Sequence, residues 1–242
     1  MTIHMHGTPL TPRSQLERMK GKSFCVSFAN PADADWCLAN GQMVLWDNGE
    51  YVFYRRRIKE NIPHSTAAAM DKSKFYAWVE PRLGHPHWAV IPDIIGGSVE
   101  DNLALIKQWP FRKALSAPVW HLDEPISHLI ELVEMGFERI CFGSAGAFWQ
   151  VGSPAWCIQI EAAFNALIHH FGHLPWIHML RGLAMCGDIF PFASADSVNV
   201  ARNFKDTNAD PERMARRIDA IQCPVTWKYL APLPDQHEDM FA

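Results

Sequence analysis

The sequence predicts an α/β protein built as a single (β/α)8 barrel of the TIM type. Eight short apolar runs alternate along the chain with helix-like stretches, and polar residues follow directly after most of these runs. This alternation is typical of a parallel sheet covered by helices, and eight runs favour a closed barrel over an open sheet. With 242 residues, 48% of them hydrophobic, the chain is long enough to form one such barrel.

The predicted strands are short and continuous, as expected for strands that are buried on both faces. In order along the chain they are residues 24–28, 43–46, 76–79, 88–92, 119–122, 139–142, 176–180 and 190–194.

Helix caps and stops mark four of the intervening helices. Ser98 is a predicted N-cap and Gly136 a predicted stop, Ser153 precedes a long apolar helix, and Asp210 caps the last one. The corresponding segments are residues 98–109, 126–135, 153–171 and 211–221. Since no repeat or linker is visible, we expect one domain over residues 1–242, with an N-terminal arm at 1–22 and a C-terminal helix and Pro-rich tail at 206–242.

Composition excludes several classes of protein. The net charge of −4 argues against a generally basic nucleic-acid coat, and basic clusters such as residues 55–57 are either solvated faces or local phosphate sites. No apolar run reaches the length of a membrane span, and the N-terminus lacks the apolar core of a secretory signal. The six cysteines form no C-x-x-C pair, which favours reduced thiols. We therefore expect a cytoplasmic protein.

Three aspartates end apolar runs: Asp47, Asp93 and Asp196. In a parallel barrel the strand ends share one mouth, where active sites lie, and holding three carboxylates there is energetically costly. The sequence therefore predicts an enzyme site at this mouth. The other residues expected on the rim are Asn30, Glu80, His121, Asp123, Gly143, Ser144, Arg181 and Gly182, and the glycines belong to two turns.

These residues resemble the tRNA-guanine transglycosylase superfamily, and most closely its phage and mobile-element members, which place 7-deazaguanines in DNA. The resemblance covers roughly residues 20–205, and the opening of the chain, with Gly7-Thr8-Pro9, is similar as well. It is carried by the segments Trp46-Asp47-Asn48-Gly49, Pro92-Asp93 and Ala195-Asp196-Ser197, with support from Gly143-Ser144-Ala145-Gly146 and from residues 178–183.

The resemblance implies a role for each aspartate. Asp196 matches the nucleophile that traps C1′ of the sugar after the base leaves, as in retaining glycosidases, with Ser197 and Asn199 as candidate hydrogen-bond donors. Asp47 matches the acid/base position, and Asp93 matches the position that accepts the N1–H and N2–H₂ of guanine.

The same reading extends to the neighbours of the aspartates and to the substrate. His121 is a candidate donor to a carbonyl of the base, Arg181 is a further substrate-binding candidate, and backbone N–H groups from Gly143, Ser144 and Ala145 are candidates for binding O6. The implied partners are DNA, less favourably tRNA, and a 7-deazaguanine base such as preQ0. A paired base cannot reach such a pocket, so base flipping or single-stranded DNA is implied.

The chain departs from the tRNA enzymes in two respects. It lacks their C-x-C-x-x-C zinc motif after the last strand, where only Cys223 and His237 remain, and it is shorter than they are. The histidine pairs at 4 and 6, 85 and 87, and 169 and 173 have no Cys, Asp or Glu at spacing that completes a ligand set. We therefore expect no metal and no cofactor, and DNA or a nucleoside rather than tRNA.

Each of these residues also has a structural interpretation. A strand-ending aspartate is often a helix cap or turn former, His121 fits a packed histidine, and Arg181 fits an ion pair at the rim. Two other functions also remain open: a hydrolase that cleaves an N-glycosidic or glycosidic bond with the same carboxylates, and a catalytically degenerate barrel that only binds a base. The sequence makes no prediction of whether the protein is a monomer or an oligomer.

Overall fold

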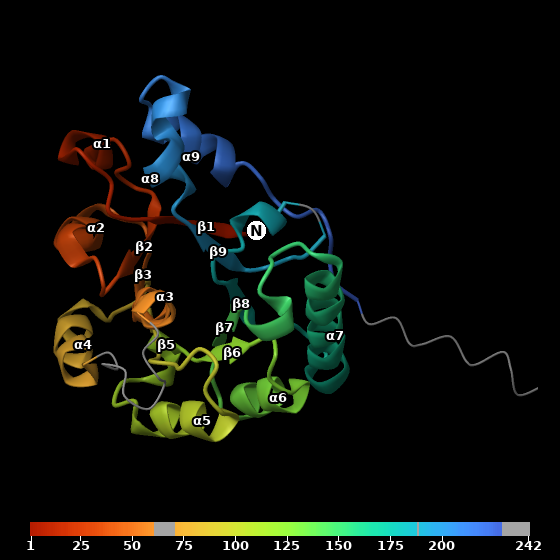
Figure 1. The fold of residues 1–242 in the computed structure, drawn as a ribbon. Helices are drawn as coiled ribbons and strands as arrows, with labels where there is room; N and C mark the ends of the chain where they lie inside the picture. Colours follow the sequence, from red (N-terminus) through yellow and green to blue (C-terminus); the bar gives the residue numbers. More distant parts are fainter. Residues whose placement is uncertain (61–70, 188, 229–242) are drawn as a thin grey trace, which may run out of the picture.

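The computed structural model describes residues 1–60, 71–187 and 189–228. Its strands all pair in parallel in one sheet, in the order β5-β4-β3-β2-β1-β9-β8-β7-β6. The sheet curls into a barrel with helices around it (Figure 1). The strands are β1 (Ile3–Gly7), β2 (Ser23–Ser27), β3 (Val44–Asp47), β4 (Trp88–Val90), β5 (Ser116–Ala117), β6 (Val119–His121), β7 (Arg139–Gly143), β8 (Trp176–Met179) and β9 (Ser194–Ser197).

The two ends of this strand order meet at Pro118. β5 pairs with β4, β6 pairs with β7, and Pro118 alone separates β5 from β6 along the chain. Proline has no N–H to donate, so it interrupts the ladder, although its carbonyl still accepts from the backbone N–H of Cys141 at 2.9 Å. β5 and β6 therefore act as one strand with a bend at Pro118, and this strand brings the barrel close to closure. The predicted TIM-type α/β barrel is confirmed.

The N-terminal arm predicted over residues 1–22 is wrong for its first part, because β1 lies inside the sheet between β2 and β9. Met5 points into the barrel interior, whereas His4 and His6 are buried on the other face. There His6 Nε2 lies 2.9 Å from Asp219 Oδ1, and Lys22 Nζ donates to Asp219 Oδ2 at 2.7 Å. A strand with buried histidines lacks the apolar pattern by which the others are recognised.

The strand predicted over residues 76–79 is also wrong, because this segment ends helix α4 (Lys72–Val79). Asp71 caps the helix by accepting from the backbone N–H of Lys74 at 3.2 Å, and Phe75 and Val79, one turn apart, are both fully buried. Four apolar residues are too few to separate a strand period from a helix period. Glu80, expected at the rim, follows in a 3₁₀ turn.

The predicted helix termini agree closely with the structure. Ser98 and Asp101 form a capping box, Ser153 accepts from the backbone N–H of Trp156, and Gly172 has the left-handed φ of 75° that ends many helices. The helices are α1 (Arg13–Glu17), α2 (Ala34–Asn40), α3 (Glu50–Glu60), α4, α5 (Val99–Gln108), α6 (Ile126–Glu134), α7 (Pro154–Phe171), α8 (Asn199–Asn203) and α9 (Pro211–Asp219).

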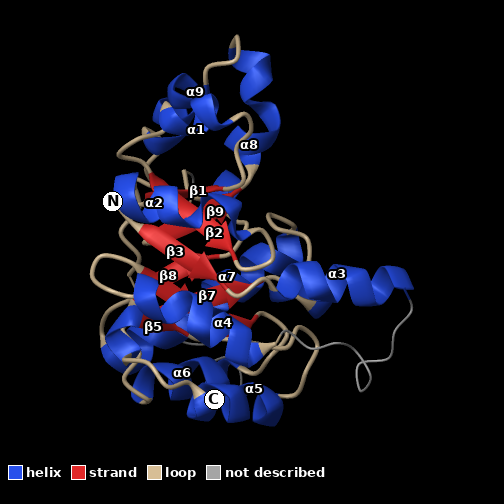
Figure 2. Cartoon of the chain, turned by 90° about the vertical axis from the view of Figure 1, so that its left-hand side faces the viewer, coloured by secondary structure: helices blue, strands red, loops and turns tan. Residues whose placement is uncertain are grey.

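Two hydrophobic layers position the site. One fills the barrel interior and includes Met5, Trp88 and Cys141, and the other packs the outer face of the sheet against the helices. Because apolar side chains fill the interior, the strand ends are the place where a barrel of this kind binds a ligand. On that side α3 projects away from the barrel (Figure 2). The Pro-rich part of the predicted tail, from residue 229 onward, lies outside the described residues.

Candidate active site

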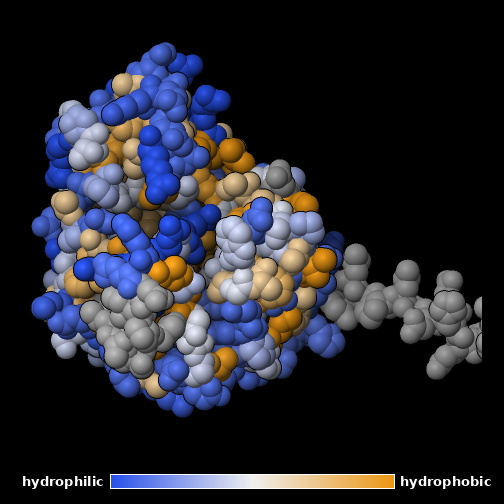
Figure 3. Space-filling view, viewed as in Figure 1, coloured by the Kyte–Doolittle hydropathy of each residue, from blue (hydrophilic) through white to orange (hydrophobic). Residues whose placement is uncertain are grey.

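A cavity of about 490 Å³ lies at the carboxyl ends of the strands, a size suited to a small ligand. Figure 3 looks onto this face, whose centre is hollowed and bordered by hydrophilic side chains. Seven of the eight predicted site residues line the cavity, and the eighth, Ala145, lines an adjoining groove. The seven are Asp47, Asp93, His121, Gly143, Ser144, Arg181 and Asp196. Asn30 lines it too, whereas Glu80 does not.

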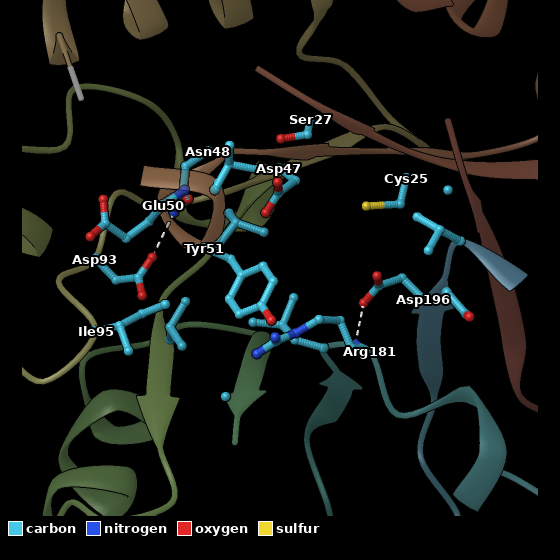
Figure 4. A pocket seen from close by; sticks show the side chains of 18 of the residues that line it. Cys25, Ser27, Asp47, Asn48, Glu50, Tyr51, Asp93, Ile95, Arg181 and Asp196 are labelled. Atoms are coloured by element: carbon cyan, nitrogen blue, oxygen red, sulfur yellow. Dashed lines mark hydrogen bonds between the residues drawn. The ribbon is translucent and has the colours of Figure 1, made fainter. Parts of the chain in front are cut away.

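The three aspartates border one space (Figure 4). Asp47 ends β3, Asp93 follows β4, and Asp196 lies within β9 rather than after it. Tyr51 and Arg181 lie between them, and the Arg181 guanidinium carbon is 3.7 Å from the centroid of the Tyr51 ring. The expected convergence of the strand ends therefore brings the three carboxylates together.

Asp196 is held by donors that the sequence does not reveal. Its Oδ1 accepts from the backbone N–H of Arg181 at 2.7 Å. Arg181 has a φ of 58°, a left-handed conformation that is uncommon outside glycine and turns its N–H toward this carboxylate. The expected donors Ser197 and Asn199 instead bond each other, since the backbone N–H of Asn199 donates to Ser197 Oγ at 3.0 Å.

His178 faces the same carboxylate from the barrel wall. It is fully buried, and its Nε2 lies 3.4 Å from Asp196 Oδ1. Its Nδ1 lies 2.8 Å from Ser194 Oγ, which also accepts from Trp176 Nε1 at 2.8 Å. Nε2 of His178 is buried without a hydrogen-bond partner among the described residues, and it is the ring nitrogen that faces Asp196.

The pKa of the Asp47 carboxyl is raised toward neutral pH. Burial raises the pKa of its carboxyl to about 6, hydrogen bonds from Ser27 and Gly49 oppose the rise, and the charges of Asp196 and Asp93 add to it. The Gly49 N–H donates to Asp47 Oδ2 at 3.1 Å. A carboxyl with this pKa exchanges protons readily near neutral pH, which suits a general acid/base.

Asp93 is fixed by two side chains at once. Asn48 Nδ2 donates to its Oδ1 at 2.7 Å, and His121 Nε2 lies 2.9 Å from its Oδ2. Burial lowers the pKa of His121, but the hydrogen bonds and charges of Asp93 and Glu124 outweigh it and raise the pKa to about 10. His121 is therefore a cation at neutral pH, and it donates to Asp93.

The second ring nitrogen of His121 is occupied as well. Its Nδ1 lies 3.3 Å from Glu124 Oε1, which also accepts from Asn102 Nδ2 at 3.1 Å. Both N–H groups of the imidazolium thus go to carboxylates, so the expected donation from His121 to a base carbonyl is not available in this arrangement. His121 instead holds Asp93 in place.

The small-residue loop after β7 has a steric explanation at two positions. Gly143 pairs with His121 across the sheet, and a Cβ there would lie 3.1 Å from His121 Cδ2. Gly146 has a φ of 53°, and a Cβ would meet the side chain of Asp123. Ser144 Oγ accepts from Trp156 Nε1 at 3.0 Å. The role of the loop's backbone N–H groups in binding O6 stays a prediction.

Among the cavity residues that were not predicted as site residues, three lie between the end of β3 and the first turn of α3. Asn48, Glu50 and Tyr51 follow Asp47 directly and lie at or near the start of α3. Glu50 is 4% exposed, and burial raises its pKa to about 7 even though Arg57 donates to it. The signal in the sequence is the pairing of Glu50 with Arg57 two helical turns later. Arg57 therefore belongs to a buried pair and not to a solvated face.

Within the described ranges, no group of three or more His, Cys, Asp or Glu side chains is arranged to hold a metal ion. Cys25, Cys37, Cys141, Cys157 and Cys186 are free thiols. None of the helices described is both long enough and apolar enough to cross a membrane.

Comparisons of the chain with protein-family models, curated proteins and solved structures found no match.

Proposed function

We propose that this protein is a base-exchange transglycosylase that replaces guanine in DNA with a 7-deazaguanine such as preQ0, through a covalent glycosyl-aspartate. The observation that carries the proposal is the meeting of three aspartates at one cavity in three different environments. Such an exchange needs a nucleophile, a proton carrier and a group that recognises the base, and one kind of side chain performs all three if its surroundings differ.

Asp196 suits the nucleophile. Its Oδ1 accepts from the Arg181 N–H and faces His178, and no hydrogen bond to the described residues engages its Oδ2, which leaves that oxygen available for C1′. Attack of a carboxylate oxygen on C1′ forms the glycosyl ester as the bond from C1′ to N9 breaks, and the bonding electrons leave with guanine. Attack by N9 of the incoming base on C1′ then releases the carboxylate.

Asp47 suits the proton carrier, because its pKa of about 6 leaves both protonation states populated near neutral pH. In the protonated form it gives its proton to the departing guanine. As a carboxylate it then takes the N9 proton from the incoming base, so it returns to its starting state after each exchange.

Asp93 suits base recognition. Each carboxylate oxygen has two acceptor positions, and Asn48 and His121 occupy one on each. The remaining position on each oxygen is available to the N1–H and N2–H₂ of a guanine-type base. Because both neighbours hold the carboxylate rigidly, it is ordered before the base arrives.

The test is exchange of guanine for preQ0 in single-stranded oligonucleotides, followed by nucleoside mass spectrometry and by intact-protein mass spectrometry for the adduct. Asp196→Asn should abolish the adduct, and Asp47→Asn should slow its formation by roughly 10²–10⁴-fold. Asp93→Asn presents an NH₂ group to guanine's donors and should weaken base binding by about 1–3 kcal/mol. Asp35→Asn, whose side chain is 87% exposed, is the matched control and should behave as wild type.

Three outcomes would contradict the proposal. Wild-type exchange by Asp196→Asn would require a different nucleophile. Release of guanine without added preQ0 would indicate a hydrolase, and base binding without release or exchange would indicate a binding protein.

A further inference from the structure

A second depression adjoins the active-site cavity. It has a volume of about 840 Å³ and is formed mainly by α3 and residues 144–149. We call it the α3 groove. Tyr51, Ile95, Ser144 and Arg181 line both the groove and the cavity, so the two are continuous. A polymer that lies in the groove would reach the three aspartates without crossing other parts of the surface.

The α3 groove is positively charged although the whole chain carries a net charge of −4. Its described lining has four cations, which are Arg55, Arg56, Lys59 and Arg181, and one carboxylate, Glu60. Arg56 Nε lies 2.9 Å from Glu60 Oε1 and pairs with it. The remaining three cations give the groove a local excess that suits a chain of phosphates.

Aromatic side chains accompany these cations. The Trp149 side chain is 71% exposed and lies on the groove, together with Tyr54 and Tyr51. Packing within the protein does not account for an indole with this exposure. Alternating cations and exposed rings are the features with which proteins bind single-stranded nucleic acid, because bases stack on the rings while the backbone follows the charges.

Three polar side chains of the groove each contact another side chain of the protein. Glu60 is paired with Arg56, Ser144 Oγ accepts from Trp156, and Tyr51 Oη accepts from Arg55 at 3.4 Å. The groove thus offers contacts to phosphates and base faces, both of which DNA supplies.

We propose that the α3 groove binds the single-stranded DNA next to the target nucleotide and guides that nucleotide into the cavity. This inference rests on the proposed function for its choice of polymer. The binding itself is separable from the chemistry, because a thymine-only strand has no guanine to exchange.

The experiment measures binding of a fluorescent oligo(dT) of about 12 nucleotides to the full chain by anisotropy at several salt concentrations. Trp149→Ala should weaken binding by about 5- to 150-fold, the range expected for one stacked base. Arg55→Gln and Lys59→Gln should each reduce the slope of log affinity against log salt by about 0.7. An oligonucleotide with abasic sites should bind wild type and Trp149→Ala with equal affinity, because it has no base to stack.

Matched controls lie on other faces of the molecule. Arg217→Gln on α9 removes an exposed cation, and Ile158→Ala on α7 removes an apolar side chain that is 67% exposed. Both should bind oligo(dT) as wild type does. A loss of binding in the controls equal to that in the groove variants would overturn the assignment of this surface.

Other outcomes separate the partner from the function. Tighter binding of oligo(U) than of oligo(dT) would overturn DNA as the partner, and a polyglutamate peptide that competes equally well at matched charge would overturn nucleic acid altogether. If the groove variants bound oligo(dT) as wild type while guanine exchange proceeded, the groove assignment would fail and the proposed function would stand. If oligo(dT) binding behaved as expected but no guanine exchange occurred, the groove assignment would stand and the proposed function would fail.

Discussion

At the scale of single residues, the three aspartates differ through their partners and not through their position. Burial sets the protonation of Asp47, a backbone N–H positions Asp196, and Asn48 with a cationic His121 fixes Asp93. The rule that strand ends meet predicts their proximity from the sequence. It does not predict these partners, because most of them come from neighbouring strands and loops.

The raised pKa of Asp47 predicts the pH dependence of covalent capture. Capture needs the protonated carboxyl, and its fraction falls tenfold per pH unit above the pKa of about 6. The capture rate should therefore drop by about 50-fold between pH 6 and pH 8, whereas Asp47→Asn should be slow and lack this decline. Rapid-quench mass spectrometry of the adduct measures both, and an identical decline in Asp47→Asn would assign the pH effect to another group.

His121 predicts a pH dependence of stability. Its pKa rises from 6.5 to about 10 on folding, so the folded state binds the proton more tightly. The stabilisation is complete below pH 6.5 and is lost as the pH rises toward 10. The free energy of unfolding in urea should fall over this range, and it should fall less steeply in His121→Gln. His170→Gln, at an exposed histidine paired with Glu134, should keep the wild-type slope.

At the scale of elements, the sequence predicts those that have a single clear period or a cap. Both ends of helix α7 are visible in the sequence, because Ser153 and Pro154 mark its start and Gly172 marks its end. The prediction of a strand at 76–79 and the failure to predict β1 were wrong for opposite reasons. The first is apolar but belongs to a helix, and the second is a strand whose outward-facing histidines are buried by a partner over 200 residues away.

The partner of His6 is Asp219, at the end of α9, and this contact predicts that α9 stabilises the fold. Asp219→Ala would leave His6 and Lys22 without their carboxylate, and the free energy of unfolding should fall by about 1–3 kcal/mol. Glu212→Ala on the same helix is the control, because its ion pair with Arg216 is exposed and should contribute less than about 1 kcal/mol. Chemical denaturation of the full chain measures both variants, and equal losses would show that the link to β1 adds nothing.

At the scale of the whole molecule, the barrel explains how much of the site was predictable. Seven of the eight predicted site residues line the cavity, since a parallel barrel gathers strand ends whichever residues occupy them. Glu50 and Tyr51, which line the cavity, and Glu124, which contacts His121, were missed because they lie beyond strand ends, on helix α3 or in the turn after β6. The sequence does not specify how such segments fold back.

The position of β1 predicts the effect of deleting residues 1–8. An arm would be dispensable, but β1 hydrogen-bonds to β2 on one side and to β9 on the other. Its loss opens the sheet next to Asp196, so the shortened chain should lose cooperative thermal unfolding, as followed by circular dichroism. A shortened chain that melts cooperatively at the wild-type temperature would show that the barrel does not need this strand.

The place of β1 in the sheet also has a consequence for synthesis on the ribosome. β1 emerges shortly before its neighbour β2, but its other neighbour, β9, is made about 190 residues later. Until then the nascent sheet has an unpaired edge at β1, and such edges are prone to association with other chains. Closure of the barrel and completion of the Asp196 site therefore wait until β9 has been synthesised, and β1 stays exposed to association with other chains until then.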